Sequence, residues 1–517
     1  MYDVIIIGAG MSGLAAGIRL AMFDRRVCIL ERHYAIGGLN SYYRLDDRNY
    51  DVGLHALTNY APRGAKHGPL PRLMRQLRLS WDEFELAEQN GSVIAFPDVR
   101  LQFDNDPARL AAEIVRAFPA ERDHYPRMLA ALLNYEELQS PQAATSAREM
   151  LAGTLRDPQL IEMLLCPVMF YGSATEHDLD WGSFSVLFRA IFLEGLCRPR
   201  GGIRTILKPL VQRFKQLGGE LRLHSGVQQI SADRGEVVHV VLDDGAELTA
   251  RQVISSAGWN ETMRLCAATP EKVEAIAQPS PFGRGQGEGV GSRTGSLAST
   301  LSHSENAQRP QQPAGPVGRM TFFESICTLD CQPRDLGFAD TIVFYNDAPR
   351  FDYARPDDFA DLRSGIVCSP NNYQYAAGEE NGDSTGLQAL GNAKLPQPVE
   401  GTIRLTALAN FDRWAALGPE DYSFQKQHWR QRLLDSAARF IPNVSQHVVA
   451  HDTFTPRTIR HFTGHDYGAV YGAPQKRYDA STPFDHVFVC GADQGYVGIV
   501  GTLTSGIQVA NMLLQRV

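Results

Sequence analysis

The sequence has 517 residues, 44% of them hydrophobic, and a formal net charge of −8 at pH 7. A chain of this length and composition can bury a large core and is long enough for two domains. Lysine and arginine are scattered, without the runs that follow a phosphate backbone, so we expect no nucleic-acid partner.

Cysteine content and hydropathy indicate the cellular compartment in which the protein is expected. The eight cysteines form no C-x-x-C pair, and a chain of this size needs no disulfide framework, so we expect reduced thiols in a cytoplasmic protein. The apolar stretch 4–16 has no basic residue before it and contains glycines, which suits a strand and turn better than a signal peptide. The sequence contains no uninterrupted run of about 18 apolar residues, so we expect no membrane-spanning helix. Peripheral contact with one membrane face is compatible with the sequence.

The first motif in the chain is a strand, a glycine-rich turn and a helix. Residues 4–7 are the β-branched run of a buried parallel strand, and residues 8–13 read G-A-G-M-S-G before a helical stretch. Gly8 permits the tight turn, Gly10 lets the backbone approach a pyrophosphate, and Gly13 lets the helix pack closely on the strand. The helix N-terminus then points free N–H groups at the phosphates.

A second strand, residues 26–30, follows this helix and ends in Glu31, which stands 23 residues after Gly8. An acid at this place can accept hydrogen bonds from the ribose hydroxyls of an adenosine. The pattern predicts a Rossmann-type dinucleotide site, with a ligand-free glycine turn as the alternative.

The choice between NAD and FAD depends on Gly37 and Gly38, six and seven residues after Glu31. A double glycine there resembles the extended motif of the FAD enzymes that include amine oxidases, phytoene desaturases and Rab GDP-dissociation inhibitors. In those proteins the pair lets a loop pass close to the flavin side of the cofactor. The resemblance implies FAD.

A middle segment has the pattern of a second α/β piece. We expect a helix at 205–217, a strand at 220–223, a hairpin over 237–249 and a strand at 253–258. This order resembles the second cofactor-domain segment of phytoene desaturase relatives, where a valine like Val227 meets the adenine through its backbone. An ordinary α/β segment packed beside the first one is the alternative.

Near the end of the chain, the strand 484–490 is followed by Gly491-Ala492-Asp493 and a helix from about 500 to 514. In flavoproteins of this type the acid after such a strand, here Asp493, binds the ribityl or pyrophosphate region. The helix N-terminus beyond it offsets negative charge on the reduced flavin ring. A purely structural strand and helix is the alternative.

The two long insertions differ in composition. In the first, Asp106-Pro107 and Asp157-Pro158 are helix-start signals, and the runs 160–171 and 184–192 are apolar on all sides. Such runs are either core or face an apolar ligand or a membrane. The second insertion should supply an antiparallel sheet with strands at 320–329, 341–345 and 403–409. The low-complexity stretch 278–318 predicts a disordered loop, and 376–401 a shorter one.

These elements predict an α/β fold with two domains. A Rossmann-type FAD-binding domain is assembled from the discontinuous segments 1–63, 197–273 and 444–517. An α+β substrate-binding domain, with an antiparallel sheet and apolar helices, takes 64–196 and 274–443.

Taken together, the chain resembles the phytoene desaturase, carotenoid isomerase and retinol saturase superfamily of FAD-dependent oxidoreductases. Residues 50–55 look like the Asp-Gly-His stretch of retinol saturases, and 455–458 with 467–472 resemble the segment before the last cofactor strand. The insertions match only in outline. Many desaturases and amine oxidases have arginine directly after the double glycine, whereas this chain has Leu39; that counts against an amine oxidase and leaves the direction of hydride transfer open.

The motifs and the resemblance together assign the site. The predicted FAD contacts are Gly8, Gly10, Met11, Ser12, Gly13, Glu31, Arg32, Gly37, Gly38, Leu39, Asn40, Val227, Ala257, Gly258, Gly491, Asp493, Gly498 and Ile499. His55, Tyr471 and Tyr496 are the candidates to handle a proton near the flavin ring, and each is alternatively an ordinary buried polar group. Nothing in the sequence indicates a metal site.

The resemblance implies hydride exchange between flavin N5 and a polyene isoprenoid lipid, in desaturation, saturation or isomerisation. Two other functions stay open. An amine oxidase-like flavoenzyme should have an aromatic cage and a lysine near N5, which the sequence does not identify. A non-catalytic escort for prenyl lipids, of the GDP-dissociation-inhibitor type, should have lost the flavin motif that Gly8, Gly10, Gly13 and Glu31 preserve.

Overall fold

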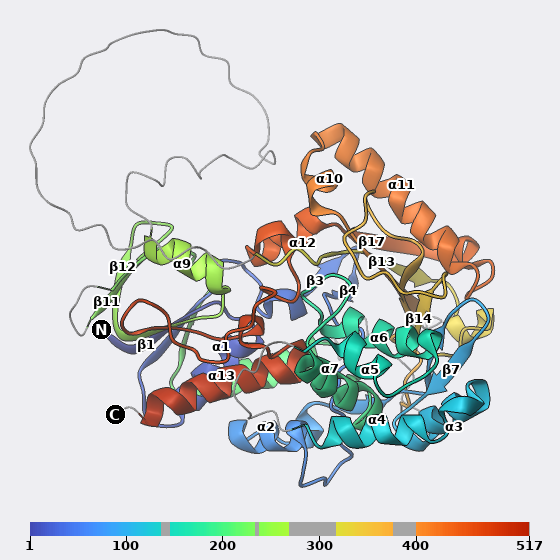
Figure 1. Cartoon of the computed structure of the whole chain (residues 1–517). Coiled ribbons are helices and arrows are strands. Elements are labelled where there is room, and N and C mark those ends of the chain that lie inside the picture. The colour runs from blue at the N-terminus through green and yellow to red at the C-terminus, as the bar shows by residue number, and fades with distance from the viewer. Residues whose placement is uncertain (136–144, 233–236, 268–316, 376–399, 516–517) are drawn as a thin grey trace, which may run out of the picture.

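Two seven-stranded sheets, each covered by helices, form the two halves of the molecule (Figure 1). The computed structural model describes all residues except 136–144, 233–236, 268–316, 376–399 and 516–517. The low-complexity stretch 278–318 therefore lies outside the described residues apart from its last two positions. The shorter stretch 376–401 does so up to 399, and Gly401 begins a strand.

The first sheet has the Rossmann-type arrangement that the N-terminal motif predicts. A parallel core runs in the order β18-β12-β1-β2-β9, and the antiparallel hairpin β10-β11 pairs with the first part of β12. Residues 253–255, expected to begin a separate strand, continue the hairpin strand, so β12 changes from antiparallel to parallel partners along its length. The strands are β1 (Tyr2–Ile7), β2 (Val27–Leu30), β9 (Glu220–Arg222), β10 (Val227–Ala232), β11 (Val238–Leu242), β12 (Glu247–Ser255) and β18 (Val487–Val489).

Two helices from opposite ends of the chain pack against each other on this sheet. α1 (Met11–Ala21) and α13 (Gly498–Gln515) lie side by side (Figure 1), and a Cβ added to Gly506 would be 2.0 Å from the backbone oxygen of Ser12. Because only hydrogen fits at Gly506, the two helix backbones are in direct contact. The remaining helices of this half are α2 (Pro69–Leu77), α8 (Arg204–Gln216) and α9 (Trp259–Ala267).

The second sheet is mostly antiparallel, as expected for the insertions. Its order is β17-β13-β16-β15-β14-β6-β7, and β14 pairs with β6 in parallel. The three expected strands are confirmed as β13, β14 and β16. The strands are β6 (Ser92–Ala95), β7 (Arg100–Phe103), β13 (Phe322–Leu329), β14 (Ile342–Asn346), β15 (Ser364–Cys368), β16 (Gly401–Leu408) and β17 (Val448–Phe454).

Four strands of this sheet were not anticipated from the sequence. β6 and β7 come from the insertion expected to be mainly helical, and β15 had no strong pattern. β17 belongs to the stretch 444–517, expected with the cofactor-binding segments, yet it pairs with β13 along most of its length. Its half-exposed, alternating residues match an edge strand, which carries no long apolar run to reveal it.

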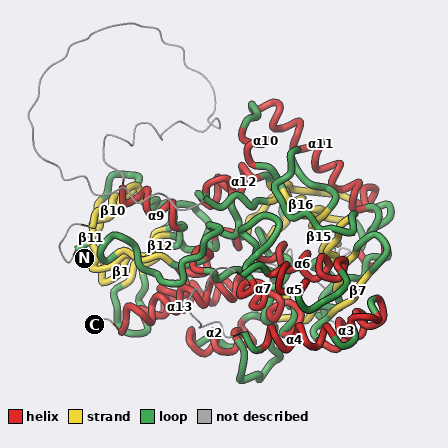
Figure 2. Tube along the Cα trace, in the orientation of Figure 1, coloured by secondary structure: helices red, strands yellow, loops and turns green. Residues whose placement is uncertain are grey.

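Helices cover both faces of the second sheet (Figure 2). α11 packs on one face through Trp429, Leu433 and Leu434, while α3, α6 and α7 contribute to the core on the other. The helix-start signals are confirmed, because Asp106 and Asp157 accept hydrogen bonds from the first turns of α3 and α6. The helices of this half are α3 (Pro107–Ala117), α4 (His124–Leu133), α5 (Ala147–Ala152), α6 (Pro158–Gly172), α7 (Trp181–Phe188), α10 (Phe411–Ala415), α11 (Pro419–Ala437) and α12 (Pro456–Thr463).

The two apolar runs of the first insertion are mainly core. Residues 160–170 are buried in α6, and 184–192 are largely buried in α7 and the π-helical turn after it. Among the described residues, no helix combines the length and apolar character needed to cross a bilayer. Two short ribbons join the halves: β3 (Tyr42–Leu45) with β4 (Arg48–Asp51), and β5 (Leu86–Glu88) with β8 (Cys197–Pro199).

Candidate cofactor and substrate site

Three segments that are far apart in the sequence meet at the glycine-rich turn. The backbone N–H of Gly37 donates to the Ala9 oxygen at 2.9 Å, and the Ser256 hydroxyl donates to the Ile7 oxygen at 2.9 Å. From the C-terminal segment, a Cβ on Gly491 would be 3.3 Å from the hydroxyl oxygen of Ser12. The N-terminal, middle and C-terminal pieces therefore surround one crevice.

The turn leaves room where a pyrophosphate is expected. A Cβ built on Gly10 meets no atom within 4 Å, whereas one on Gly13 would be 2.1 Å from the Gly8 oxygen. Gly13 is thus required by the fold itself, while the space beside Gly10 is unfilled by protein. No side chain caps the N-terminus of α1, so its first N–H groups can bind phosphate oxygens.

Glu31 lies at the carboxyl end of β2 and links the turn to the crevice. The carboxylate is buried and accepts hydrogen bonds from the Ala9 N–H at 2.8 Å and the His33 N–H at 3.0 Å. It also lines the large pocket described below. Each carboxylate oxygen has a second lone pair, so Glu31 can hold the turn and still accept from a ribose.

The predicted adenine end is assembled around Arg32 and Val227. The Arg32 Nε lies 3.8 Å from a carboxylate oxygen of Asp243, and a Cβ on Gly226, next to Val227, would be 3.0 Å from the same nitrogen. Val227 begins β10 with its side chain buried, so its backbone is the part that remains for a ligand.

Asp493 ties two loops together. Its Oδ2 accepts from the Trp259 N–H and its Oδ1 from the Ala473 N–H, each at 2.6 Å. The first bond fixes the loop that contains Ala257 and Gly258. A direct contact between Asp493 and the cofactor stays a prediction. In the structure, Asp493 links the two loops that form this wall of the crevice.

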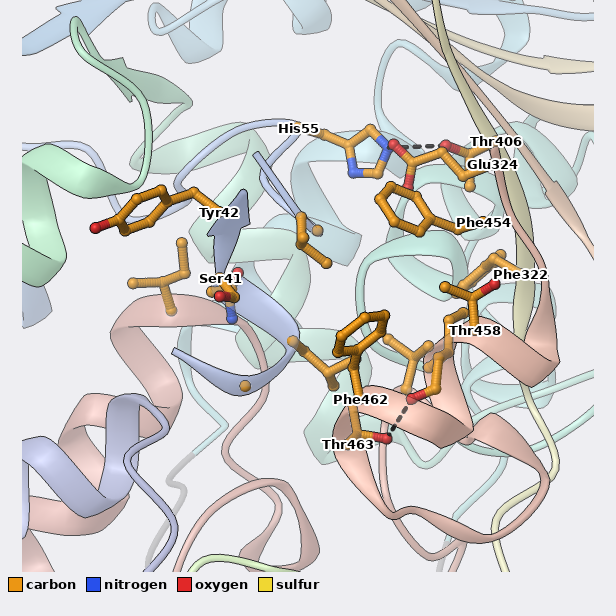
Figure 3. Close-up of a pocket in the computed structure, with 18 of the residues that line it drawn as sticks. Ser41, Tyr42, His55, Phe322, Glu324, Thr406, Phe454, Thr458, Phe462 and Thr463 are labelled. Atoms are coloured by element: carbon orange, nitrogen blue, oxygen red, sulfur yellow. Dashed lines mark hydrogen bonds and ion pairs between the residues drawn. The ribbon is translucent and has the colours of Figure 1, made fainter. Parts of the chain in front are cut away.

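One large pocket continues from the crevice into the second half of the molecule. Its cavity volume is about 360 Å³. Glu31, Gly38, Leu39, Asn40, Gly498 and Ile499 line one end, and the other is lined by Phe170, Phe322, Ile366, Phe454 and Val470. Strands of the second sheet thus provide an apolar, aromatic wall opposite the predicted cofactor residues (Figure 3).

His55 projects into this pocket from the loop after β4. Its Nε2 lies 2.8 Å from the Thr406 hydroxyl and 3.6 Å from Glu324 Oε1, while Nδ1 points the other way (Figure 3). Burial lowers the pKa of His55 to about 4, because the charged imidazolium loses its water; Glu324 opposes this shift, and Arg404 and Arg198 add to it. The ring is therefore neutral above that pH.

A buried network of charges supports His55 and was not anticipated from the sequence. Arg404, only 1% exposed, donates to Glu324 Oε1 at 2.7 Å and to the Asp51 backbone oxygen at 2.8 Å. Arg198 pairs with the Asp51 carboxylate at 2.5 Å and donates to the Leu54 oxygen. The network fixes the loop that carries His55 to strands of the second sheet.

The two tyrosine candidates lie in different places. Tyr471 lines the pocket and donates its hydroxyl to the Phe170 backbone oxygen, and burial raises its pKa above the usual range. Tyr496 is half-buried against Gly501 and is not among the described residues that line the pocket. Tyr171 also lines it, and its buried hydroxyl has no hydrogen-bond partner among the described residues.

At another part of the lining, Asp452 and Lys426 face each other. Asp452 accepts from the Tyr43 hydroxyl at 2.7 Å and lies 3.8 Å from Lys426 Nζ. Burial and the Asp452 charge raise the pKa of Tyr43, so it remains a neutral donor. The negative charge of Asp452 is therefore already balanced by the positive charge of Lys426.

Comparison with known families bears on the class of cofactor. The model of the family described as flavin containing amine oxidoreductase matches residues 11–279, just over half of the 517 residues. The match includes α1, the double glycine and the middle segment that ends beyond β12.

Among curated proteins, the all-trans-retinol 13,14-reductase of Danio rerio is 24% identical, covering 99% of this chain and 86% of that protein. The chloroplastic prolycopene isomerase of Arabidopsis thaliana is 25% identical, covering 50% of this chain and 48% of that protein. The phytoene desaturase of Fusarium fujikuroi is 27% identical, covering 49% of each. The chain thus spans about half the length of the last two relatives.

Solved structures agree on the fold. An oxidoreductase from Methanosarcina mazei superposes with a TM-score of 0.60 at 16% identity, covering 98% of this chain and 99% of that one. Putrescine oxidase with bound putrescine superposes with a TM-score of 0.58 at 16% identity, covering 100% of this chain and 99% of that one. Together with the family match, these neighbours identify the cofactor as FAD, and the unfilled space at Gly10 fits it.

The space beside Gly10 generates a first prediction. Gly10 has φ −71° and ψ 177°, which any residue can adopt, so Gly10→Ala should leave the fold intact and meet only the cofactor. Overpacking of about 1–3 kcal/mol corresponds to a roughly 5- to 150-fold weaker binding of FAD. Flavin content after gel filtration, and the thermal midpoint of the apoprotein, measure the two effects separately.

Gly13→Ala is the matched control, because its Cβ would press on the Gly8 oxygen in the protein itself. It should lower the apoprotein midpoint. Equal losses of apoprotein stability in both variants would contradict the pyrophosphate assignment at Gly10.

Proposed function

Because the chain belongs to the flavin containing amine oxidoreductase family, we propose that it is an FAD-dependent oxidoreductase acting on a long polyene isoprenoid lipid. The observation that carries this proposal is the continuous pocket between the predicted cofactor residues and an apolar wall of the second sheet. The names of the three curated relatives, with retinol, prolycopene and phytoene as their substrates, support the same class.

The pocket lining matches an extended apolar molecule. Phe170, Phe322, Phe454 and Ile366 present rings and methyl groups, which bind a polyene by excluding water and by dispersion contacts. When bound, FAD supplies the exchange of a hydride at an unactivated carbon, which no amino-acid side chain can perform. The residues of the chain have the tasks of orienting the polyene and handling the accompanying proton.

We assign to His55 the role of accepting the proton that accompanies hydride transfer. Its neutral ring can accept a proton at Nδ1, which has no partner among the described residues, while Thr406 and Glu324 hold Nε2. The low pKa keeps the ring ready as a base at neutral pH. Glu324 and Thr406 are positioning residues in this proposal, because they act through the imidazole. Tyr471, whose hydroxyl is engaged by the Phe170 oxygen, shapes the wall.

An amine substrate is the second candidate, favoured by the family name. A cationic amine needs an unpaired negative charge beside the apolar wall, but Glu324 is paired with Arg404, and Asp452 with Lys426. Glu31 also lines the pocket, but at the cofactor end, where the N–H groups of Ala9 and His33 bind it. This arrangement favours an uncharged substrate. The unfilled turn and the buried Glu31 favour a flavin-binding enzyme over an escort without cofactor.

The test is a direct product assay. The purified protein with FAD is incubated aerobically, anaerobically, and anaerobically with dithionite-reduced flavin, because saturating a double bond consumes a hydride from the flavin. Each condition is tested with liposomes carrying phytoene, prolycopene, lycopene or retinol, and in parallel with putrescine and a monoamine. We expect a change in the polyene absorption spectrum and a product of altered hydrogen content or geometry. Conversion of an amine with no conversion of any polyene would overturn the proposal, as would a protein that binds no flavin.

His55→Gln should lower kcat by about 10²- to 10⁴-fold, the usual contribution of a general base. Flavin content should not change. In the wild type, kcat should fall as pH drops toward about 4, where the imidazole takes up a proton. The pH profile of single-turnover rates measures both effects.

Thr406→Val tests the positioning role with a side chain of the same shape. Losing the hydroxyl removes one hydrogen bond, worth about 1 kcal/mol and so roughly fivefold in rate. Glu324→Gln should move the acid limb of the profile to lower pH, because the carboxylate raises the pKa of His55. If the acid limb of the pH–rate profile does not move in Glu324→Gln, or if His55→Gln keeps full activity, His55 is excluded as the base.

We also propose peripheral contact with a lipid surface at the pocket mouth. Phe462 and Tyr42 line the pocket and are 44% and 37% exposed. Apolar side chains at a pocket mouth can dip into the interface from which a lipid substrate would enter. Arg460, in the last turn of α12, adds positive charge near Phe462.

Phe462→Ser should reduce co-flotation with liposomes that contain anionic lipid, because it removes buried apolar area worth about 2 kcal/mol. Phe23→Ser is the matched control, since Phe23 is 49% exposed in the first half of the molecule and does not line the pocket. Equal flotation of the wild type and Phe462→Ser would contradict contact at this mouth.

A further inference from the structure

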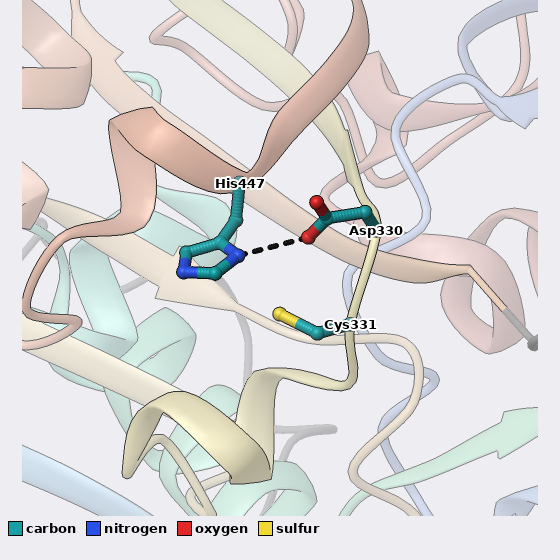
Figure 4. Close-up of side chains that lie close together, drawn as sticks. All are labelled: Asp330, Cys331 and His447. Carbon is teal, nitrogen blue, oxygen red and sulfur yellow. Dashed lines mark hydrogen bonds and ion pairs between the residues drawn. The ribbon is translucent and has the colours of Figure 1, made fainter.

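Asp330, Cys331 and His447 form a cluster of potential metal ligands outside the pocket (Figure 4). The sequence gives no sign of it, because Cys331 and His447 lie far apart in the chain and in no recognisable ligand spacing. We propose that this cluster is a structural binding site for a divalent, zinc-type metal ion. It involves neither the cofactor nor the substrate of the proposed reaction.

Neighbouring strand ends bring the three side chains together. Asp330 and Cys331 directly follow β13, and His447 ends the short 3-10 turn (Val444–His447) that leads into β17. The Asp330 N–H donates to the His447 backbone oxygen at 3.0 Å. This bond fixes the two backbone segments beside each other, so the cluster does not depend on flexible side chains alone.

The geometry is close to that of a metal site. One donor atom from each residue lies within 4.8 Å of the other two, and His447 Nδ1 lies 2.9 Å from Asp330 Oδ1. Ligand atoms around tetrahedral zinc are roughly 3.5 Å apart, given bond lengths of about 2.0–2.3 Å. Side-chain movements of about 1 Å would therefore bring all three donors to one ion.

The donor set selects the class of metal. A thiolate and an imidazole favour zinc over calcium or magnesium, which prefer oxygen ligands. Three protein ligands leave a fourth position for water. Cys331 is accessible enough to bind, because it is half-buried whereas six of the eight cysteines are buried. The thiol binds a metal ion as its thiolate, so binding releases a proton.

The location indicates a structural role. Leu329, the last residue of β13, lies five residues from Glu324, which is roughly 16 Å along the strand from the pocket wall. An ordinary ion pair between Asp330 and His447 would explain their contact, but it would not require a thiol at the same place. A bound ion would join the turn after β13 to the start of β17, an edge strand of the second sheet.

Cobalt titration of the untagged, EDTA-treated protein with FAD bound tests the proposal. We expect one Co²⁺ per chain with tetrahedral d–d bands at wavelengths longer than flavin absorbs, displaced by Zn²⁺. Cys331→Ser should abolish the thiolate-to-cobalt charge-transfer band, and His447→Gln should weaken binding by about 100-fold or more. Zn²⁺ should raise the thermal midpoint of the wild type but not that of Cys331→Ser or His447→Gln.

Cys266→Ser and His428→Gln are the matched controls, since Cys266 is the other half-buried cysteine and His428 lies on α11. Both should bind cobalt as the wild type does. Midpoints measured in EDTA show whether the variants fold. Absence of a tetrahedral spectrum, or binding that Cys331→Ser leaves unchanged, would overturn the proposal.

Discussion

The structure depends on close contacts around the glycine-rich turn, both within the N-terminal segment and with residues from the far end of the chain. Gly13 lies against the Gly8 oxygen, Gly506 against the Ser12 oxygen, and Gly491 beside the Ser12 side chain. Any side chain at Gly13 or Gly506 would separate α1 from its neighbours by the width of a methyl group. These contacts shape the crevice for the dinucleotide, and the large pocket begins there.

The first half of this arrangement could be predicted from the sequence because its signals are local. The turn at Gly8, the acid at Glu31 and the double glycine at Gly37 stand at fixed spacings set by the shape of the ligand. The long antiparallel strands β13 and β16 also had clear patterns. The expected apolar runs were real, but burial in the core explains most of them better than a ligand does.

The supporting residues of the pocket could not be predicted, because their meaning depends on contacts between distant strands. Glu324 and Thr406 lie within strands that read as ordinary core, and only the pairing of β13 with β16 places them opposite each other. Arg404 looks like a residue of an exposed face until the fold buries it. A buried charge is costly to desolvate and needs a partner of opposite sign, which explains why Glu324 is paired with Arg404 and Asp51 with Arg198.

The order of strands in the two sheets has a consequence for biosynthesis. The second sheet combines strands from 92–103, 322–368, 401–408 and 448–454, and the first is completed by β18 at 487–489. The second half can therefore close only after residue 454 has left the ribosome, and the first only after residue 489. Such non-local pairing makes folding slow and exposes unpaired strand edges, so the growing chain should depend on chaperones or early cofactor capture to avoid aggregation.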